Sequence, residues 1–137
     1  MSAASWALQQ AIFATLAASG DVQDAVGDPP RIFDAVPRGS AFPYIVIGDD
    51  KESDWSTATE PGTAHALTIH IWSRASGRKE TRLAAEAVID ALNGAELDLD
   101  GQSLIDLRYL ESESTRENDG ETVHAQLRFR ALLEPST

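Results

Sequence analysis

Two histidines, His65 and His70, stand five positions apart in the stretch HALTIHIWSR at residues 65–74, and imidazole is the commonest metal-binding side chain. Apolar residues alternate with other residues between them, which is typical of a strand. Successive side chains of a strand point to opposite faces, so an odd separation directs the two rings apart. Zinc needs its ligands within about 2 Å of one point. From a regular strand, the pair therefore cannot share an ion.

His70 and His124 form a better pair, because each is expected on the more polar face of its strand and the two strands can be neighbours. A carboxylate would have to complete such a site. The chain has three histidines, no cysteine and no helical pair of histidines four residues apart. Zinc sites are built largely from these residue types. We therefore predict neither a metal nor another cofactor.

The segment ELDLDG at residues 96–101 partly imitates a calcium-binding loop, with acidic residues at alternate positions before a glycine. The twelfth position of such a loop requires a bidentate glutamate, and this chain has Leu107 there. The flanking residues also have the pattern of strands, whereas helices flank an EF-hand loop. We do not expect calcium binding.

Catalytic motifs are equally weak. Carboxylate pairs such as Asp49 with Asp50 are easy to find among 22 Asp and Glu residues, and nothing nearby indicates the desolvation that tunes a catalytic carboxyl group. The sequence contains no G-x-S-x-G nucleophile motif and no G-K-[ST] phosphate-binding motif. We predict that the protein is not an enzyme.

The charge of the chain is strongly negative: 11 Lys and Arg against 22 Asp and Glu give −11. Such a surface repels phosphate backbones and anionic lipid, which disfavours nucleic-acid and membrane binding. Hydrophobic residues make up 42%, as in an ordinary soluble domain. The Ala-rich start lacks a basic segment and favours a helix over a signal peptide. The absence of cysteine fits a reducing compartment.

The N-terminal part predicts two helices. Leu8, Ile12 and Leu16 recur every fourth position within residues 4–18, which is the spacing of one helix face. A short second helix follows, with Asp21 placed as its N-cap.

Strands are predicted next. A Pro-rich crossing has a possible short strand at residues 31–36, and the β-branched run at 44–48 is typical of a buried strand. Residues 49–62 are polar and turn-rich, which indicates a long loop around Trp55. Residues 65–74 form the next strand.

The C-terminal part predicts a helix over residues 78–93 and two hairpins, at Asp100-Gly101 and Asp119-Gly120, the first with a type I′ turn. The last strand alternates strictly, with Val123, Ala125, Leu127, Phe129 and Ala131 on one face and His124, Gln126, Arg128 and Arg130 on the other. The expected fold class is α+β: one domain over residues 1–137, with a mixed, mostly antiparallel sheet of four to five strands and two main helices packed on it.

Aromatic and basic side chains predict an assembly surface, because Trp and Arg are enriched in buried interfaces. The alternative is that a helix of the same domain covers their sheet face. The predicted interface residues are Trp55, His70, Trp72, Arg74, Arg78, Arg128 and Arg130.

The order of these segments resembles one family. An N-terminal ALQQAIFATL helix, a Pro-rich crossing, PYIVIG with an acidic loop after it, LTIHIWSR before a charged helix, and a closing DGETVHAQLRFRALL strand follow in turn. This order resembles the tail terminator, or tail-completion, family of siphophages and phage-like gene transfer agents. The likeness runs from about Ala7 to Leu133.

The resemblance implies a virion structural protein whose ring, commonly a hexamer, caps the head-proximal end of the tail tube and ends tube polymerisation. Its expected partners are the tail tube protein and a head completion or neck (stopper) protein. The expected location is the particle, after assembly in the bacterial cytoplasm. The family offers no catalytic residues to carry over. DNA would pass through the lumen without specific binding, and an acidic wall would let it slide.

Two other classes remain open at this point: a small metal-dependent enzyme, or an acidic adaptor or regulator on the same α+β fold. Metal analysis separates the first from a terminator, and tight binding to a basic partner without ring formation would favour the second. The Ala-rich, acidic composition is closer to a gene transfer agent of a bacterium with a GC-rich genome than to a typical phage.

Overall fold

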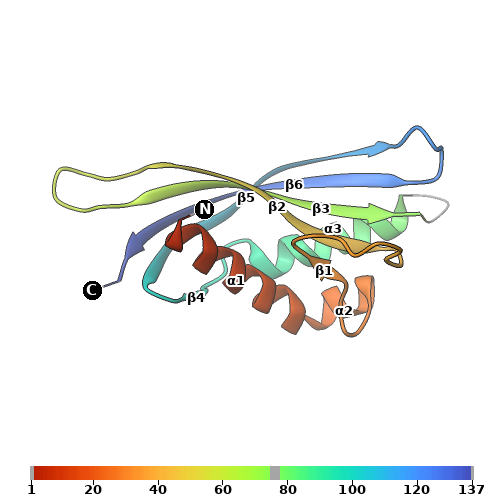
Figure 1. Cartoon of the computed structure of the whole chain (residues 1–137), viewed down its shortest axis with the longest axis horizontal. Helices are drawn as coiled ribbons and strands as arrows, with labels where there is room; N and C mark the ends of the chain where they lie inside the picture. The colour runs from red at the N-terminus through yellow and green to blue at the C-terminus, as the bar shows by residue number, and fades with distance from the viewer. Residues whose placement is uncertain (1, 75–77, 137) are drawn as a thin grey trace.

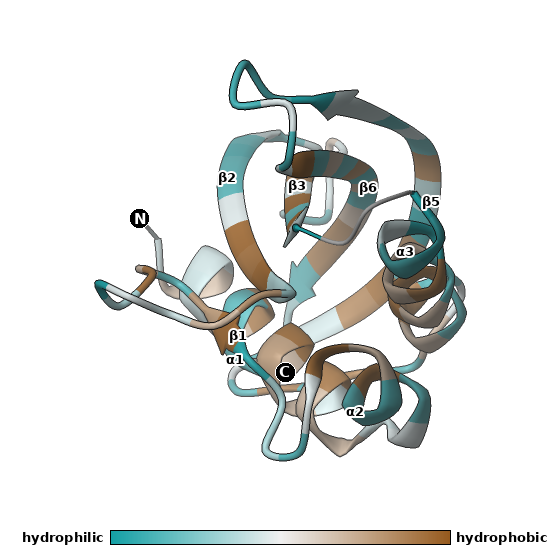
Figure 2. Cartoon of the chain, turned by 90° about the vertical axis from the view of Figure 1, so that its right-hand side faces the viewer, coloured by the Kyte–Doolittle hydropathy of each residue, from teal (hydrophilic) through white to brown (hydrophobic). Residues whose placement is uncertain are grey.

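The fold is a mixed α+β structure built on one curled sheet (Figures 1 and 2). The computed structural model describes residues 2–74 and 78–136. In chain order the described elements are α1 (Ala3–Ala18), α2 (Gly20–Val26), β1 (Ile32–Phe33), β2 (Tyr44–Asp54), β3 (Thr63–Ser73), α3 (Lys79–Leu92), β4 (Asp98–Leu99), β5 (Gln102–Arg116) and β6 (Val123–Pro135). The strand order is β1-β2-β3-β6-β5-β4, and only the β1–β2 pair is parallel.

The class and the mostly antiparallel sheet are as predicted, but the expectation of four to five strands was too low, and the two main helices are accompanied by the short helix α2. The described residues form six strands and three helices. The two shortest strands have two residues each: β1 lies within the possible strand at residues 31–36, and β4 is the first arm of the predicted Asp100-Gly101 hairpin. The short helix α2 begins after Ser19 and not after Asp21, because the Ser19 side chain accepts the Val22 amide hydrogen bond.

The predicted loop at residues 49–62 is mostly a β-hairpin. Strand β2 continues to Asp54, which pairs with Thr63 of β3, across a register shift between Ile47 and Asp50. Only residues 55–62 connect the strands, and the Trp55 amide closes this connection by donating to the Gly62 carbonyl at 2.9 Å. Figure 1 shows this hairpin extending beyond the helices at the left.

A second long hairpin, β5–β6, extends in the opposite direction (Figure 1). In its turn, hydrogen bonds from Thr122 and from the Glu121 amide lower the pKa of the Asp119 carboxyl to about 2. Both Asp-Gly hairpins form as predicted, with Gly101 and Gly120 at φ of 74° and 75°. No other residue type in the described part of the chain has positive φ, so the Asp100-Gly101 turn is not type I′.

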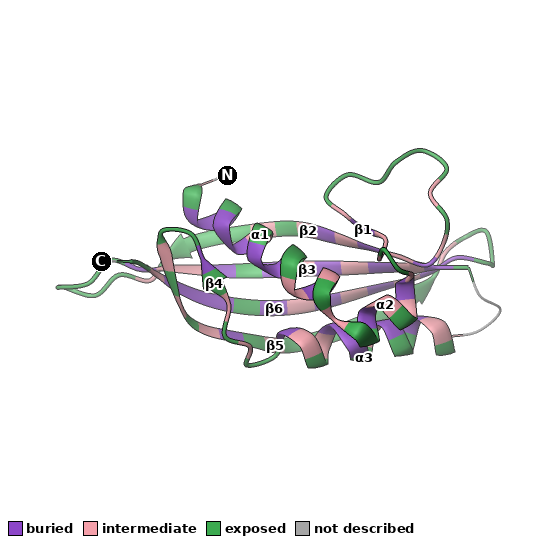
Figure 3. Cartoon of the chain, turned by 90° about the horizontal axis from the view of Figure 1, so that it is seen from below, coloured by how far each residue is buried: buried purple, intermediate pink, exposed green. Residues whose placement is uncertain are grey.

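The core lies between the helices and one face of the sheet (Figure 3). Helix α1 contributes its predicted stripe of Leu8, Ile12 and Leu16, each fully buried. Every residue assigned to the inner face of the last strand is buried as well: Val123, Ala125, Leu127, Phe129 and Ala131. Within the described residues, all three helices lie on this one side of the sheet, and none covers its other face (Figures 1 and 2). No helix among the described residues is long and apolar enough to span a membrane.

Candidate assembly surfaces

A stack of three rings marks the helix-free face of the sheet. His70 and Trp72 project from β3, and His124 projects from the neighbouring β6. The Trp72 and His124 rings lie parallel, with centroids 3.8 Å apart and an interplanar angle of 7°. The His70 ring lies 5.0 Å from that of His124, and its Nδ1 is 2.7 Å from His124 Nε2. The pairing of β3 with β6 thus brings together the two histidines that the sequence offered as the best metal pair.

The geometry of this pair favours a hydrogen bond between two neutral imidazoles. One ring must donate and the other accept across the 2.7 Å contact. Burial lowers the pKa of His70, and Arg128 lowers it further against the opposing effect of Asp49. Burial and the proximity of His70 likewise lower the pKa of His124, against the opposing effect of Glu117. Within residues 2–74 and 78–136, no three His, Cys, Asp or Glu side chains converge as a metal site would require.

The lowered pKa values of His70 and His124 predict a pH-dependent stability. Because the pKa of each ring is lower in the folded protein, the unfolded chain takes up protons first as the pH falls below the ordinary histidine pKa of 6.5. The contribution of the stack to stability is therefore complete above pH 6.5 and falls as the pH drops below it. Urea unfolding between pH 5 and 8 measures this slope.

The variant His124→Gln is the matched test, since it removes one titrating ring of the pair. We expect a shallower slope for it between pH 5 and 6.5 than for the wild type. Equal slopes would show that the pair does not titrate with folding.

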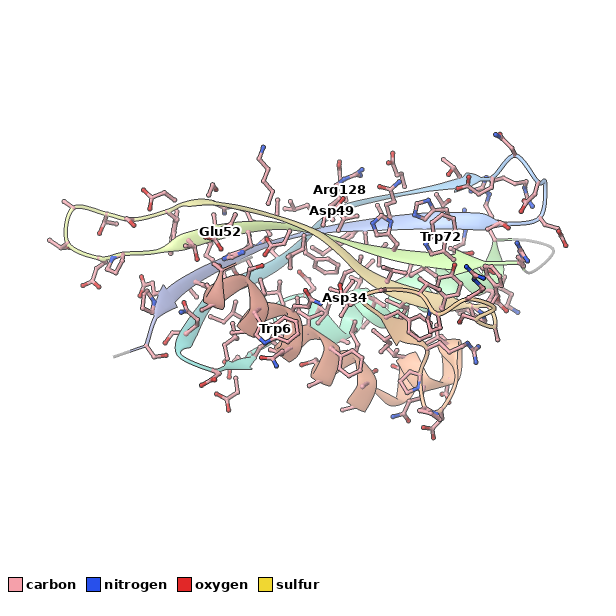
Figure 4. All side chains as sticks on the ribbon, viewed as in Figure 1. Trp6, Asp34, Asp49, Glu52, Trp72 and Arg128 are labelled. Carbon is pink, nitrogen blue, oxygen red and sulfur yellow. The ribbon has the colours of Figure 1, made fainter. Side chains whose placement is uncertain are left out.

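Most of the predicted interface arginines are engaged within the subunit. The Arg74 guanidinium lies 4.4 Å from the Phe42 ring centroid, and its Nε donates to Thr122. Arg78 donates to the Ser114 hydroxyl at 2.6 Å. Strand β6 presents Arg128 and Arg130 on the helix-free face, and Arg128 bonds to the carboxylates of Glu111 and Glu113 at 3.4 and 3.1 Å. Figure 4 labels Arg128 on this side.

Trp55 lies at the other end of the sheet. Its ring packs on Gly62, where an added Cβ would approach the indole to 2.9 Å, and the side chain is half-buried against its own hairpin. The structure therefore does not gather the predicted interface residues in one patch. The residues toward the β5–β6 hairpin are His70, Trp72, Arg74 and Arg78. Midway along β6 lie Arg128 and Arg130, and Trp55 lies at the β2–β3 hairpin.

An aromatic patch on α1 escaped the sequence analysis. Trp6 and Phe13 are 48% and 46% exposed, and they line a hollow of about 400 Å³ together with Gln9, Gln10, Asp34 and Ile47. Figure 4 labels Trp6 on this helix. The sequence could have revealed this patch, because Trp6 and Phe13 are seven positions apart and therefore share a helix face, and this face is not the one formed by Leu8, Ile12 and Leu16.

A buried polar cluster joins α1 to the β2–β3 hairpin. The side chain of His65 is fully buried, and its Nδ1 lies 3.1 Å from both carboxylate oxygens of Asp50. Ser5 donates a hydrogen bond to the same carboxylate, and Ser2 donates to Glu52. Burial raises the pKa of Asp50, but the hydrogen bonds from His65 and Ser5 outweigh it and the net shift is downward. The strand parity of His65 predicted its inward direction, and its partner was not predicted.

Comparisons with known proteins find matches that cover most of the chain. A family model described as "Tail completion protein gp17" matches residues 10–134. The tail completion protein gp17 of Bacillus phage SPP1 is 24% identical over 130 residues, which cover 95% of this chain and 94% of the relative.

Two solved structures resemble the fold. One is a chain of a native gene transfer agent particle, with 34% identity, a TM-score of 0.86, and coverage of 93% of this chain and 94% of that chain. The other is the gp17 protein of bacteriophage SPP1, with 23% identity, a TM-score of 0.64, and coverage of 93% and 89%.

Proposed function

The chain belongs to the tail completion protein gp17 family, as the order of its segments predicted, and on this premise we propose that it completes the tail of a phage-like particle. Its subunits form a ring, a hexamer, on the head-proximal end of the tail tube. The ring ends tube polymerisation and presents the surface to which the head completion or neck protein attaches. DNA passes through its lumen, and no catalytic role is assigned to the chain.

The observation that carries this proposal is the likeness to a chain of a gene transfer agent particle over 93% of the present chain, at 34% identity and a TM-score of 0.86. The shape of the subunit supports it physically. A long sheet carries helices on one face only, and its two hairpins extend in opposite directions (Figure 1). Such a subunit can contact one partner at each end and a neighbour along each edge. We therefore place it in the particle, at the junction of tail and head.

We place the helix-free face of the sheet toward the lumen. Acidic and basic side chains are mixed on this face, where strand register puts Asp106, Glu111 and Glu113 together with Lys51, Arg108, Arg128 and Arg130. Figure 4 shows Asp49 on the same side as Arg128. Arg128 is paired with two glutamates, and Arg108 lies 3.5 Å from Asp106. Because two of the three arginines on this wall face carboxylates, it should bind phosphates only weakly, and the net charge of −11 adds repulsion. The duplex can then slide.

The β2–β3 hairpin is our candidate for the contact with the tube, because its connection at residues 55–62 extends beyond the helices (Figure 1). Replacing residues 56–61 with Asn-Gly keeps Trp55 opposite Gly62, since this dipeptide suits a two-residue hairpin turn. We expect a folded subunit that does not cap tubes, so tubes assembled with it grow without a defined end. Electron microscopy of tube lengths and cosedimentation with tail tube protein measure this.

Asn118→Ala, an exposed change in the opposite hairpin, is the matched control and should cap normally. Normal capping by the shortened hairpin would refute its role in tube contact while leaving the ring proposal intact.

A further inference from the structure

We propose that the ring is closed by two complementary rims of the subunit, the acidic α1–β2 rim of one copy docking on the basic α3–β5 rim of the next. The α1–β2 rim consists of Trp6, Phe13 and Asp34 beside the free edge of β2. The α3–β5 rim consists of Arg78, Arg82, Ile105 and Leu110. This inference rests on the proposed function and specifies the surfaces that the subunits use.

The edge of β2 is open along most of its length. Strand β1 pairs with it only at Ile45 and Val46, so within the described residues no second strand pairs with it from Ile47 to Asp54. An exposed strand edge presents unpaired backbone groups and invites another chain. The hollow of about 400 Å³ lies beside this edge, between α1 and the residues after β1.

The chemistry of the α1–β2 rim is aromatic and acidic. The half-exposed rings of Trp6 and Phe13 line the hollow, and the carboxylate of Asp34 lies at its margin. Asp34 is exposed, and Figure 4 labels Trp6 and Asp34 on the helix side of the sheet. Aromatic anchors surrounded by charge are typical of interface centres. A matching surface should therefore be aliphatic and basic.

The α3–β5 rim has this complementary character. Between α3 and β5 lies a groove of about 220 Å³ whose charged lining residues are Arg78, Arg82 and Glu113, and the Glu113 carboxylate is already paired with Arg128. Ile105 and Leu110 of β5 are 48% and 52% exposed. The backbone of β5 is already largely occupied here: the Leu107 carbonyl accepts from Gly94, and Asn93 accepts from the Tyr109 amide at 2.9 Å. This rim therefore offers side chains to a partner and not a strand edge.

The partner that docks on each rim is a second copy of this chain, because the acidic, aromatic rim and the basic, aliphatic rim that complement each other both belong to the same subunit. Viewed end-on, β2 and β5 lie on opposite sides of the subunit (Figure 2). Two different surfaces that fit each other from opposite sides generate a head-to-tail series, which closes when the rotation per subunit allows. Opposite charges on the two rims also fix the order of docking and oppose like-with-like contacts.

Charge reversal of one rim at a time tests the pairing. Asp34→Arg gives the α1–β2 rim the same charge as the rim it docks on, and Arg82→Glu places a carboxylate opposite Asp34, so each variant alone should weaken the docking of its own copies. We expect at least about tenfold weaker self-association for each, since like charges placed together at an interface cost several kcal/mol. An equimolar mixture of the two should recover assembly, because subunits that alternate around the ring again face opposite charges. Molar mass by light scattering, alone and on tail tube protein, measures both results.

The control is Asp24→Lys, which changes charge by the same sign and amount as Asp34→Arg but lies on α2, in the groove between α2 and α3. It should assemble like the wild type. Wild-type assembly of the single variants, or a mixture that stays dissociated, would overturn the pairing of the rims and leave the ring proposal intact. Loss of tube binding with unchanged self-association would assign a rim to the tube protein and also overturn it. A wild type that assembles neither alone nor on tubes would refute the proposed function itself.

Discussion

Replacing Asp50 with alanine should lower the free energy of unfolding by about 1–3 kcal/mol, the range expected when a buried polar group such as the His65 ring loses its hydrogen-bond partner. The fully buried imidazole of His65 would lose the carboxylate that lies 3.1 Å from its Nδ1, and Ser5 would lose its acceptor. The change would also remove a side-chain contact between the start of α1 and the β2–β3 hairpin, leaving that of Ser2 with Glu52. Urea denaturation at pH 7 and one fixed protein concentration measures the loss.

The acid dependence gives a second measure of the same contact. The pKa of Asp50 is lowered by its hydrogen bonds, net of burial, so its contribution is present above the unfolded value of 3.8 and is lost as the pH falls through the lower folded value. The difference between wild type and Asp50→Ala should therefore shrink below about pH 4. Asp49→Ala is the control, because this exposed neighbour should change stability by less than about 0.5 kcal/mol. Equal effects of the two changes would contradict the buried contact.

The change Phe129→Ala should cost about 3–5 kcal/mol of unfolding free energy, as truncation of a buried aromatic ring does. Phe129 is only 1% exposed and meets the ring of Tyr109 edge-on at 5.7 Å. It lies on β6, which has β3 on one side and β5 on the other, so the surrounding strands restrict collapse of the cavity.

Leu110→Ala is the comparison variant for Phe129, since this residue of the adjacent strand is 52% exposed. Both are measured by urea denaturation at the same protein concentration. A loss below about 1 kcal/mol for Phe129→Ala would mean that the core between sheet and helices is not packed as described.

Strict alternation made the two central strands predictable. The parity of β3 placed His65 inward and His70 outward, and the structure confirms both, since His65 is buried among core residues and His70 stacks on the helix-free face. The face assignment of β6 is confirmed in the same way. Periodicity was sufficient here because these strands bury one face along their whole length, so a one-residue slip would expose the core.

The alternation of apolar and polar residues did not predict the strands where the sheet extends beyond its helices. Residues 49–54 resemble a loop because they have no apolar face to bury, yet they pair with β3 through the backbone. The register shift between Ile47 and Asp50 also changes which residues face inward. Backbone pairing is independent of side-chain type, so the sequence carried no signal for it. The contact of Asp50 with His65 follows from that pairing and was equally hidden.

The interface residues were selected by their chemical type, which does not indicate where on the folded subunit they lie. Trp72 and Arg128 were correctly assigned to strand faces, but the register that stacks Trp72 on His124 and sets Arg128 against Glu111 could not be read from either strand alone. Trp6 was overlooked because it lies on the first helix, whose apolar periodicity was already explained by the opposite face with Leu8, Ile12 and Leu16. As an interface set, these residues remain a prediction.

The most direct test of the central claim, that this chain forms a ring capping the tail tube, is its molar mass in solution. Light scattering behind a sizing column, across a concentration series with and without purified tail tube protein, makes the measurement. We expect a hexamer, or a monomer that forms a sixfold cap only on tubes. A monomer at every concentration that ignores tube protein would contradict the account.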